Sequence, residues 1–234
     1  MHPSPARRGR SGTNAAARAK RSLRILITAG PTREFLDSVR FISNTSSGKM
    51  GYAIAEAAAA AGHHVTLVSG PVSLDAPAGV RTIRVTTAAE MAAAAKRAFY
   101  RADAAIFAAA VCDYRPKHRA PKKRPKATGP KLIELAPTED IAAACGRIKE
   151  HRVAICFALE DHAGRRHAEA KLLRKNCDAI VLNGPENVGS EAAATQFLAR
   201  RGYWQDWGRT PKAKLARRLV RQLQRLASAA IKNI

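Results

Sequence analysis

The most regular feature of the chain is the alternation of short apolar runs with alanine-rich segments of helical length. LRILITAG, from Leu23, and HVTLVS, from His64, have the composition of buried strands. The segment between them, from about Ser47 to Ala61, is predicted to be a helix that stops at Gly62. A strand, a helix and a strand in this order form a βαβ unit, in which the two strands run parallel.

The same pattern continues to the end of the chain, and it predicts an α/β fold that is Rossmann-like, with a mostly parallel sheet and helices on both faces. Thr87 and Glu90 have the spacing of a capping box at the start of the second helix. Further strands are expected at residues 79–85, 104–111, 131–135, 152–159 and 176–183, further helices at 87–101, from 138, after 161 and from about 211, and a turn at 203–207.

A loop of small polar residues, Ser43 to Lys49, leads into the first helix. The first amides of a helix have no partner within the helix, and they carry the positive end of its dipole. Gly48 lets an anion approach the backbone, and Lys49 adds a full charge, so the loop is a candidate anion site. The alternative is that Ser46 or Ser47 merely caps the helix.

Two common nucleotide folds do not fit this loop. A tight GxGxxG turn is absent, and the second strand ends in Ser69-Gly70-Pro71 instead of the acidic residue that binds a ribose hydroxyl. The Walker motif is also absent, because Met50 follows the Gly48-Lys49 pair where a hydroxyl is required. An anion bound here is therefore held by a different kind of loop.

A carboxylate is expected at the same edge of the sheet. The apolar run AAIFAAAV ends in Cys112-Asp113, and ligands of such sheets bind beyond the carboxyl ends of the strands. For Asp113 taken alone, a helix cap or a solvated turn is an equally good interpretation.

Charge is the strongest feature of the composition, with a formal net charge of +23. The opening residues 1–22 hold six Lys or Arg and no acid, which predicts a disordered basic tail before a domain at 23–234. Residues 115–131 hold eight Lys or Arg, four Pro and no acid, which predicts a mobile basic flap. The flap could contact nucleic acid, close over a small polyanion, or simply be solvated.

No signal peptide or membrane-spanning run is found, so a cytoplasmic protein is expected. The four cysteines, Cys112, Cys145, Cys156 and Cys177, lie far apart without a CxxC pair, which predicts reduced and mostly buried thiols.

Seven motifs stand along the chain in this order: GPTRE, VRFISNTSSGKMGYAIAE, VTLVSGPV, AAAVCDYRP, TEDI, FALE and KLLRKNCDAIVLN. Together they resemble phosphopantothenoylcysteine synthetase, also called phosphopantothenate-cysteine ligase. The resemblance covers about Leu23 to Ile234. Many bacteria fuse this domain behind a flavin-dependent decarboxylase that has no counterpart here, so a stand-alone ligase with a separate decarboxylase as a candidate partner is expected.

The resemblance implies an enzyme of coenzyme A biosynthesis. Its substrates are 4'-phosphopantothenate and L-cysteine, with CTP as the co-substrate in most bacteria and Mg²⁺ arriving on the triphosphate. The carboxylate is activated as an acyl-nucleotide with release of pyrophosphate, and the cysteine amine then displaces CMP. ATP in place of CTP stays open, and the family is typically homodimeric.

The resemblance also implies roles for particular residues. Asn44 engages the phosphopantothenoyl group through its amide donors, Arg40 is a phosphate or carboxylate clamp, and Lys123 assists formation of the acyl-nucleotide. Gly30, Ser46, Ser47, Gly48 and Lys49 form the phosphate or substrate loop. The nucleotide contacts implied are Phe107, Ala108, Ala109, Asp113, Lys123, Pro137, Thr138, Glu139, Phe157, Lys171 and Lys175, and no metal ligands of the protein are implied.

The flap departs from the family pattern Lys-x-Lys-Lys, because Lys123-Arg124-Pro125-Lys126 has a proline in the third position. The main alternative function is a non-catalytic protein that binds nucleic acid or a nucleotide on the same fold. It predicts salt-sensitive binding without turnover, but it leaves the Asn44 loop and Asp113 unexplained. A membrane partner is not expected, and an oxidoreductase on a dinucleotide fold fits less well still.

Overall fold

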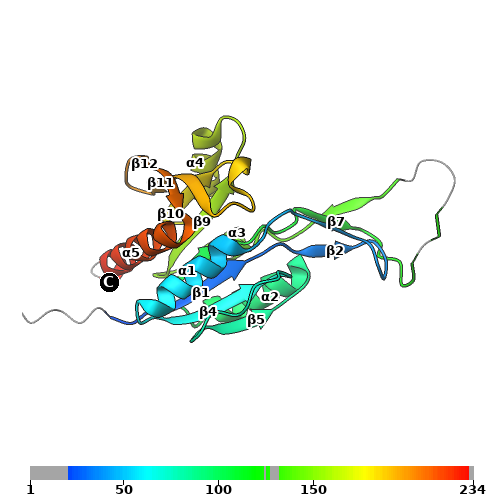
Figure 1. Cartoon of the computed structure of the whole chain (residues 1–234), viewed down its shortest axis with the longest axis horizontal. Helices are drawn as coiled ribbons and strands as arrows, with labels where there is room; N and C mark the ends of the chain where they lie inside the picture. The colour runs from blue at the N-terminus through cyan, green and yellow to red at the C-terminus, as the bar shows by residue number, and fades with distance from the viewer. Residues whose placement is uncertain (1–20, 124, 127–131, 232–234) are drawn as a thin grey trace, which may run out of the picture.

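The computed structural model describes residues 21–123, 125–126 and 132–231. One eight-stranded sheet has the strand order β12-β11-β10-β9-β6-β1-β4-β5, with all neighbours parallel except the two pairs that involve β11 (Figure 1). Its strands are β1 (Arg24–Ala29), β4 (His64–Ser69), β5 (Arg81–Arg84), β6 (Ala104–Phe107), β9 (Val153–Leu159), β10 (Ala179–Asn183), β11 (Ala192–Ala199) and β12 (Gln205–Pro211). The predicted α/β class with a mostly parallel sheet is confirmed.

Helices cover both faces of the sheet, as predicted (Figure 1). Side chains alternate along β1, so that Ile25 and Ile27 belong to one core and Leu26 to the other. A strand buried on both faces reads as an uninterrupted apolar run, which is why these strands are visible in the sequence. The first core is covered by α1 (Lys49–Ala60) and α5 (Lys212–Ile231), and the second by α2 (Ala88–Phe99), α3 (Ile141–Arg147) and α4 (Gly164–Arg174).

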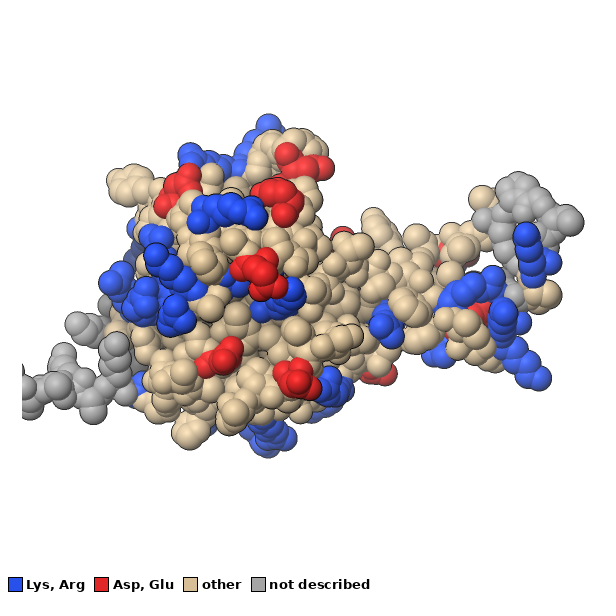
Figure 2. Space-filling model, viewed as in Figure 1, with Lys and Arg blue, Asp and Glu red and all other residues tan. Residues whose placement is uncertain are grey.

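An arm projects from the carboxyl edge of the sheet (Figure 1). It consists of two antiparallel pairs, β2 (Arg33–Phe35) with β3 (Phe41–Ser43) and β7 (Tyr114–Pro116) with β8 (Leu135–Pro137), and of the described residues that connect them. Large apolar side chains are exposed along the arm, namely Val39, Phe41, Tyr114, Leu132, Ile133 and Leu135. Lys and Arg gather at its far end and also over α5 (Figure 2).

Several predicted boundaries are wrong. The first helix begins at Lys49 instead of Ser47. The strand predicted at 104–111 ends at Phe107, because the chain beyond it turns to form a bridge between Ala110 and Pro31. The strand predicted at 131–135 lies instead at Leu135–Pro137, and Lys131 falls outside the described residues.

Two hairpins were not predicted. The predicted turn at 203–207 runs into β12, which pairs with β11. The predicted loop between β1 and α1 contains the β2–β3 hairpin, and the basic flap begins within β7, so its first residues are held by β8. These elements are short or polar, and their strands are stabilised by pairing that a periodicity analysis does not detect.

Several smaller predictions are confirmed. Gly62 has a φ of 83° after the end of α1. Thr87 and Glu90 form the capping box at the start of α2. All four cysteines are buried free thiols. Among the described helices, no helix is both long and apolar enough to cross a membrane, and the tail at residues 1–20 lies outside the described residues.

Candidate active site

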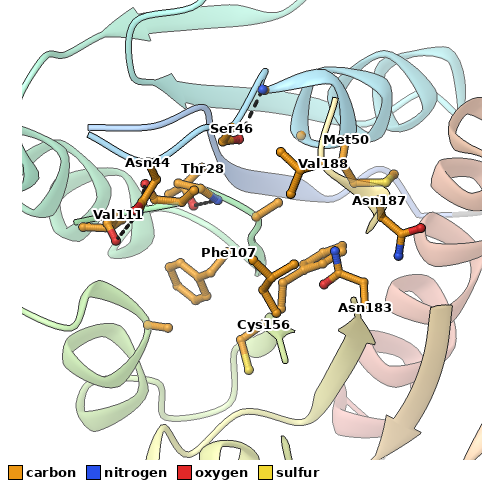
Figure 3. Close-up of a pocket in the computed structure, with 18 of the residues that line it drawn as sticks. Thr28, Asn44, Ser46, Met50, Phe107, Val111, Cys156, Asn183, Asn187 and Val188 are labelled. Atoms are coloured by element: carbon orange, nitrogen blue, oxygen red, sulfur yellow. Dashed lines mark hydrogen bonds between the residues drawn. The ribbon is translucent and has the colours of Figure 1, made fainter. Parts of the chain in front are cut away.

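A cavity of about 500 Å³ opens at the carboxyl ends of the parallel strands. Asn44 and Val111 lie at one end of it, Met50, Asn187 and Val188 lie at the other, and Phe107 and Cys156 lie between them (Figure 3). The volume is in the range of small-molecule sites, and the location is where parallel α/β sheets bind ligands.

The N-terminus of α1 faces this cavity. Its N-cap residue, Gly48, has a φ of 76° and no side chain caps the helix. The Ser46 hydroxyl accepts a hydrogen bond from the Gly48 amide at 3.3 Å, and that amide precedes the first turn. Neither serine therefore serves as the helix cap, and the first-turn amides of α1 stay available to an anion.

Asn44 is fixed by the backbone of the segment that follows β6. Its Nδ2 atom donates to the carbonyl oxygens of Ala110 and Val111, both at 3.1 Å (Figure 3). An amide nitrogen has two hydrogens, so both donors of Asn44 are used. This arrangement differs from the predicted one, in which the amide donates to the substrate, because the atom left for a ligand is the acceptor Oδ1.

Backbone hydrogen bonds fix the segment from Ala109 to Asp113 at the wall of the cavity. The Asp113 carbonyl oxygen accepts a hydrogen bond from the Thr138 amide at 2.9 Å. The buried Thr28 hydroxyl accepts one from the Ala109 amide at 3.3 Å. These bonds hold the backbone beside the cavity, and the Asp113 carboxylate makes no hydrogen bond or ion pair with another described residue.

Four lysines line the cavity, and three of them are paired with carboxylates. Lys171 pairs with Glu160, Lys175 with Asp140 at 3.2 Å, and Lys49 with Glu191. Hydrogen bonding and the positive charge of Lys49 lower the pKa of the Glu191 carboxyl. The fourth lysine is Lys212, and burial lowers its pKa, with further lowering by the charge of Lys49.

Most of the predicted site residues line this one cavity, and the exceptions are Gly30, Arg40, Lys123 and Pro137. Gly30 supports the site from behind, because a Cβ on Gly48 would lie 3.5 Å from the Gly30 Cα. Pro137 ends β8, and it pairs with Tyr114 in the arm. The predicted residues in the cavity are Asn44, Ser46, Ser47, Gly48, Lys49, Phe107, Ala108, Ala109, Asp113, Thr138, Glu139, Phe157, Lys171 and Lys175.

Arg40 and Lys123 belong to the arm. The Arg40 guanidinium binds the buried Asp37 carboxylate through Nε at 2.9 Å and Nη2 at 2.6 Å, while 48% of the arginine side chain stays exposed. Lys123 is exposed in the flap. Neither side chain lines the cavity of its own chain.

Some residues that line the cavity were not predicted from the sequence. Asn183 ends β10, and its position at the carboxyl end of a predicted strand could have indicated it. Asn187, Val188 and Lys212 are brought to the cavity by the β10–β11 connection and by the β11–β12 hairpin. No motif in the linear sequence marks these three residues.

The chain matches one family model over residues 20–226, and the model describes the "DNA/pantothenate metabolism flavoprotein C-terminal domain". The match covers the whole sheet, helices α1 to α4, most of α5 and the residues around the cavity. It thus includes every element that positions the candidate site.

Two curated relatives are each 48% identical to this chain. One is the coenzyme A biosynthesis bifunctional protein CoaBC of Escherichia coli K12, which aligns over 188 residues, 79% of this chain and 46% of the relative. The other is named cysteine/cysteine sulfinic acid decarboxylase, from an unknown prokaryotic organism, and aligns over 169 residues, 71% of this chain and 47% of the relative. The chain therefore spans about half the length of these relatives.

The fold is also found among solved structures. A crystal structure of the C-terminal domain of CoaBC is 38% identical to this chain, with a TM-score of 0.77. The likeness covers 88% of this chain and 96% of that domain. The unmatched half of the CoaBC relative accordingly lies outside the domain to which this fold corresponds.

Proposed function

Because this chain belongs to the DNA/pantothenate metabolism flavoprotein C-terminal domain family, we propose that it is a phosphopantothenate-cysteine ligase of coenzyme A biosynthesis. The support is its correspondence to the C-terminal domain of CoaBC together with the motifs of the phosphopantothenoylcysteine synthetases. The relative named as a decarboxylase aligns with this chain over 47% of its own length, so its named activity is not assigned to this chain.

The proposal rests on one observation, that groups suited to binding anions and a nucleotide line a single cavity. The uncapped N-terminus of α1, the lysines and the Asn44 loop all line it, together with Asp113 and Phe157. A reaction between two polyanionic substrates requires positive groups arranged in advance around the reacting atoms.

In the proposed first step, a carboxylate oxygen of 4'-phosphopantothenate attacks the α-phosphorus of the nucleoside triphosphate. The bond from this phosphorus to the bridging oxygen breaks, and pyrophosphate leaves with the bonding electrons. In the second step, the neutral amine of L-cysteine attacks the acyl carbon, and the nucleoside monophosphate leaves as the amide forms and a proton is released. Asn44, fixed by two backbone carbonyls, is suited to orienting the amine through Oδ1.

The nucleotide is proposed to be CTP, as in most bacterial members of the family, with Mg²⁺ entering on its phosphates. Within the described residues, no group of three or more His, Cys, Asp or Glu side chains could hold a metal ion. Magnesium is commonly bound through substrate phosphates and one or two carboxylates, and Asp113 is a suitable carboxylate in the cavity.

The protein is further proposed to act as a homodimer that associates through its arm. Apolar side chains on the arm are exposed, among them Val39 at 57% and Leu132 at 100%, and such a patch is typical of an interface. The same arm carries Arg40 and Lys123, which lie outside the cavity of their own chain. In a dimer these two cations could meet the cavity of the partner subunit.

Mixing two inactive variants tests whether Arg40 acts across the dimer. Arg40→Ala and Asn44→Ala homodimers should each fail to make the amide. A mixture re-equilibrated from the two should regain about a quarter of the wild-type rate, because half of the dimers are mixed and each mixed dimer has one complete site. Amide formation is followed by mass spectrometry, and a mixture that stays inactive although mixed dimers form would contradict action in trans.

Lys123→Ala is expected to suppress the activation step by roughly 100-fold, because a lysine that meets developing phosphate charge stabilises the transition state. The measurement is the rate of pyrophosphate release. Lys122→Ala is the matched control, since Lys122 is an exposed lysine one position earlier in the flap. Equal rates for the two variants would remove Lys123 from the mechanism.

The proposed function is tested by measuring pyrophosphate release with Mg²⁺ and 4'-phosphopantothenate, comparing CTP with ATP, with and without L-cysteine. Turnover with CTP that depends on cysteine is the expected result. If the folded protein releases no pyrophosphate with either nucleotide, the ligase proposal fails, and a binding protein on the same fold becomes the better explanation.

A further inference from the structure

Lys212 is a buried lysine at the wall of the cavity. It is the first residue of α5, and it is only 9% exposed. Its Nζ atom donates to the Asn187 carbonyl oxygen at 3.3 Å, and its backbone amide donates to the Glu191 carbonyl oxygen at 2.9 Å. The β11–β12 hairpin and the 187–191 segment thus hold this ammonium group at the cavity.

Lys49 contacts the same 187–191 segment from the other helix of this face. Its Nζ atom donates to the Glu191 carboxylate and lies 3.4 Å from the Gly189 carbonyl oxygen. The segment therefore joins the first residue of α1 to the first residue of α5. Lys49 and Lys212 thus both contact the 187–191 segment and both line the cavity. Asn187 and Val188 of this segment lie at the same end of the cavity as Met50 (Figure 3).

The charge of Lys212 is less well balanced than that of the other lysines. Lys171, Lys175 and Lys49 each have a carboxylate in contact, whereas Lys212 contacts a backbone carbonyl oxygen. Burial and the nearby charge of Lys49 lower the pKa of Lys212, while Glu191 acts in the opposite direction. An anion that entered beside Lys212 would stabilise its charged form.

The end of the cavity that holds Lys212 also receives the α1 dipole. The first turn of α1 contains no acidic residue, and no side chain occupies its free amides. Two lysine charges and a helix N-terminus suit an anion with several negative charges better than a single carboxylate.

We propose that Lys49 and Lys212, with the N-terminal amides of α1, form a subsite for a diphosphate group, and that Glu191 competes with this anion for Lys49. The inference rests on the proposed function, in which the diphosphate is the pyrophosphate that leaves when the acyl-nucleotide forms. Its negative charge grows as the bond from the α-phosphorus breaks, and the two ammonium groups stabilise that charge.

The geometry favours a diphosphate over the single phosphate of phosphopantothenate. Asn44, the residue assigned to the phosphopantothenoyl group, lies at the opposite end of the cavity from Val188 and Asn187 (Figure 3). Phe157, near the end of β9, and Asn183, the last residue of the neighbouring β10, also line the cavity. A nucleotide whose base lies near Phe157 could extend its phosphates toward Lys49 and Lys212.

Binding of inorganic pyrophosphate with Mg²⁺, measured by calorimetry, tests the subsite without requiring turnover. Lys212→Met should weaken binding by about 10-fold, the usual effect of removing a charge-assisted hydrogen bond. Lys214→Met is the matched control, because Lys214 is exposed on the same helix two positions later, and it should stay within about twofold of the wild type.

Glu191→Gln supplies a second test that does not disturb a buried residue, because the Glu191 side chain is 84% exposed. Freed from its carboxylate, Lys49 should bind pyrophosphate about threefold more tightly, the effect of removing one competing surface ion pair. Glu186→Gln removes the same charge from an exposed residue of the same connection, and it should leave the affinity unchanged.

Three outcomes would overturn the subsite. The first is an unchanged affinity for pyrophosphate in folded Lys212→Met. The second is an equal effect of Glu191→Gln and Glu186→Gln on that affinity. The third is that inorganic phosphate binds with the same dependence on Lys212 and competes with phosphopantothenate, not with the nucleotide. If pyrophosphate binds as expected but no turnover occurs with any substrate, the subsite stands and the ligase proposal fails. If Lys212→Met turns over with the wild-type KM for the nucleotide, the ligase proposal stands and the subsite proposal fails.

Discussion

Asn44→Ala should still release pyrophosphate from the nucleotide, but its yield of amide should fall by about 100-fold or more, as for the loss of one preorganised polar group from an active site. Asn44 is fixed by two hydrogen bonds to the carbonyl oxygens of Ala110 and Val111. This leaves Oδ1 to orient the cysteine amine in the second step. The first step depends on cationic groups elsewhere, so it should proceed.

The two steps are separated by measuring pyrophosphate, the acyl-nucleotide and the amide product in the same reaction. Accumulation of acyl-nucleotide with little amide is the expected pattern. Because Asn44 is exposed, its loss should leave the fold intact, and a thermal unfolding curve checks this. A normal amide yield from Asn44→Ala would show that the loop has no part in the second step.

Asn44→Asp tests whether a side-chain oxygen at this position is enough, or whether the two hydrogen bonds that fix the side chain are also needed. The aspartate retains a side-chain oxygen, but at neutral pH it cannot donate to the two carbonyl oxygens, and its charge would be repelled by them. We expect Asn44→Asp to fail as fully as Asn44→Ala. Activity in the aspartate variant would mean that the two backbone hydrogen bonds are not needed.

Gly70→Ala should destabilise the fold by about 3 kcal/mol, the upper part of the usual range for overpacking. Gly70 follows β4, and a Cβ at this position would lie 1.7 Å from the carbonyl oxygen of Pro31 and 2.8 Å from its carbonyl carbon. Pro31 follows β1, so these are backbone atoms of the adjacent strand end that cannot rotate away. The clash between the new Cβ and Pro31 can be relieved only if the loop that leads toward Asn44 moves.

Thermal unfolding measures this effect, and a loss of about 3 kcal/mol in a chain of this size corresponds to a fall in Tm of roughly 10 °C. Gly202→Ala is the matched control, because the nearest atoms to its new Cβ are Ala199 atoms at 3.5 Å, an ordinary contact. Similar Tm values for the two variants would show that the β1 and β4 loops can separate without cost.

The order of strands and helices could be read from the sequence wherever burial is two-sided. The runs at β1, β6, β9 and β10 are almost fully apolar because both of their faces are covered by helices. The arm and the β11–β12 hairpin were missed for the opposite reason. Their strands are short or half-exposed, so pairing with a partner strand defines them, and apolar periodicity does not.

In the candidate site, too, some residues could be predicted from the sequence and others could not. Composition, spacing and family resemblance identified the polar loop from Ser43 to Lys49, Asp113, Lys171 on α4 and Lys175 at its C-cap. Those that line the cavity follow predicted strands or lie on predicted helices. Arg40 and Lys123 were assigned to the same site, and Lys123 to a basic flap, but the strand pairs β2–β3 and β7–β8 of the arm that carries them were not predicted. Their roles stay predictions that depend on a second subunit.

The sequence by itself determined the α/β class, the strand that leads to the Asn44 loop and the family to which the chain belongs, because these depend on local patterns and contiguous motifs. Only the tertiary structure decided which charges meet. Lys212 reaches the cavity through a hairpin, and Glu191 reaches Lys49 through a loop that follows β10. Such contacts join residues far apart in the chain, and the burial that determines their pKa values exists only after the sheet and both helix layers have assembled.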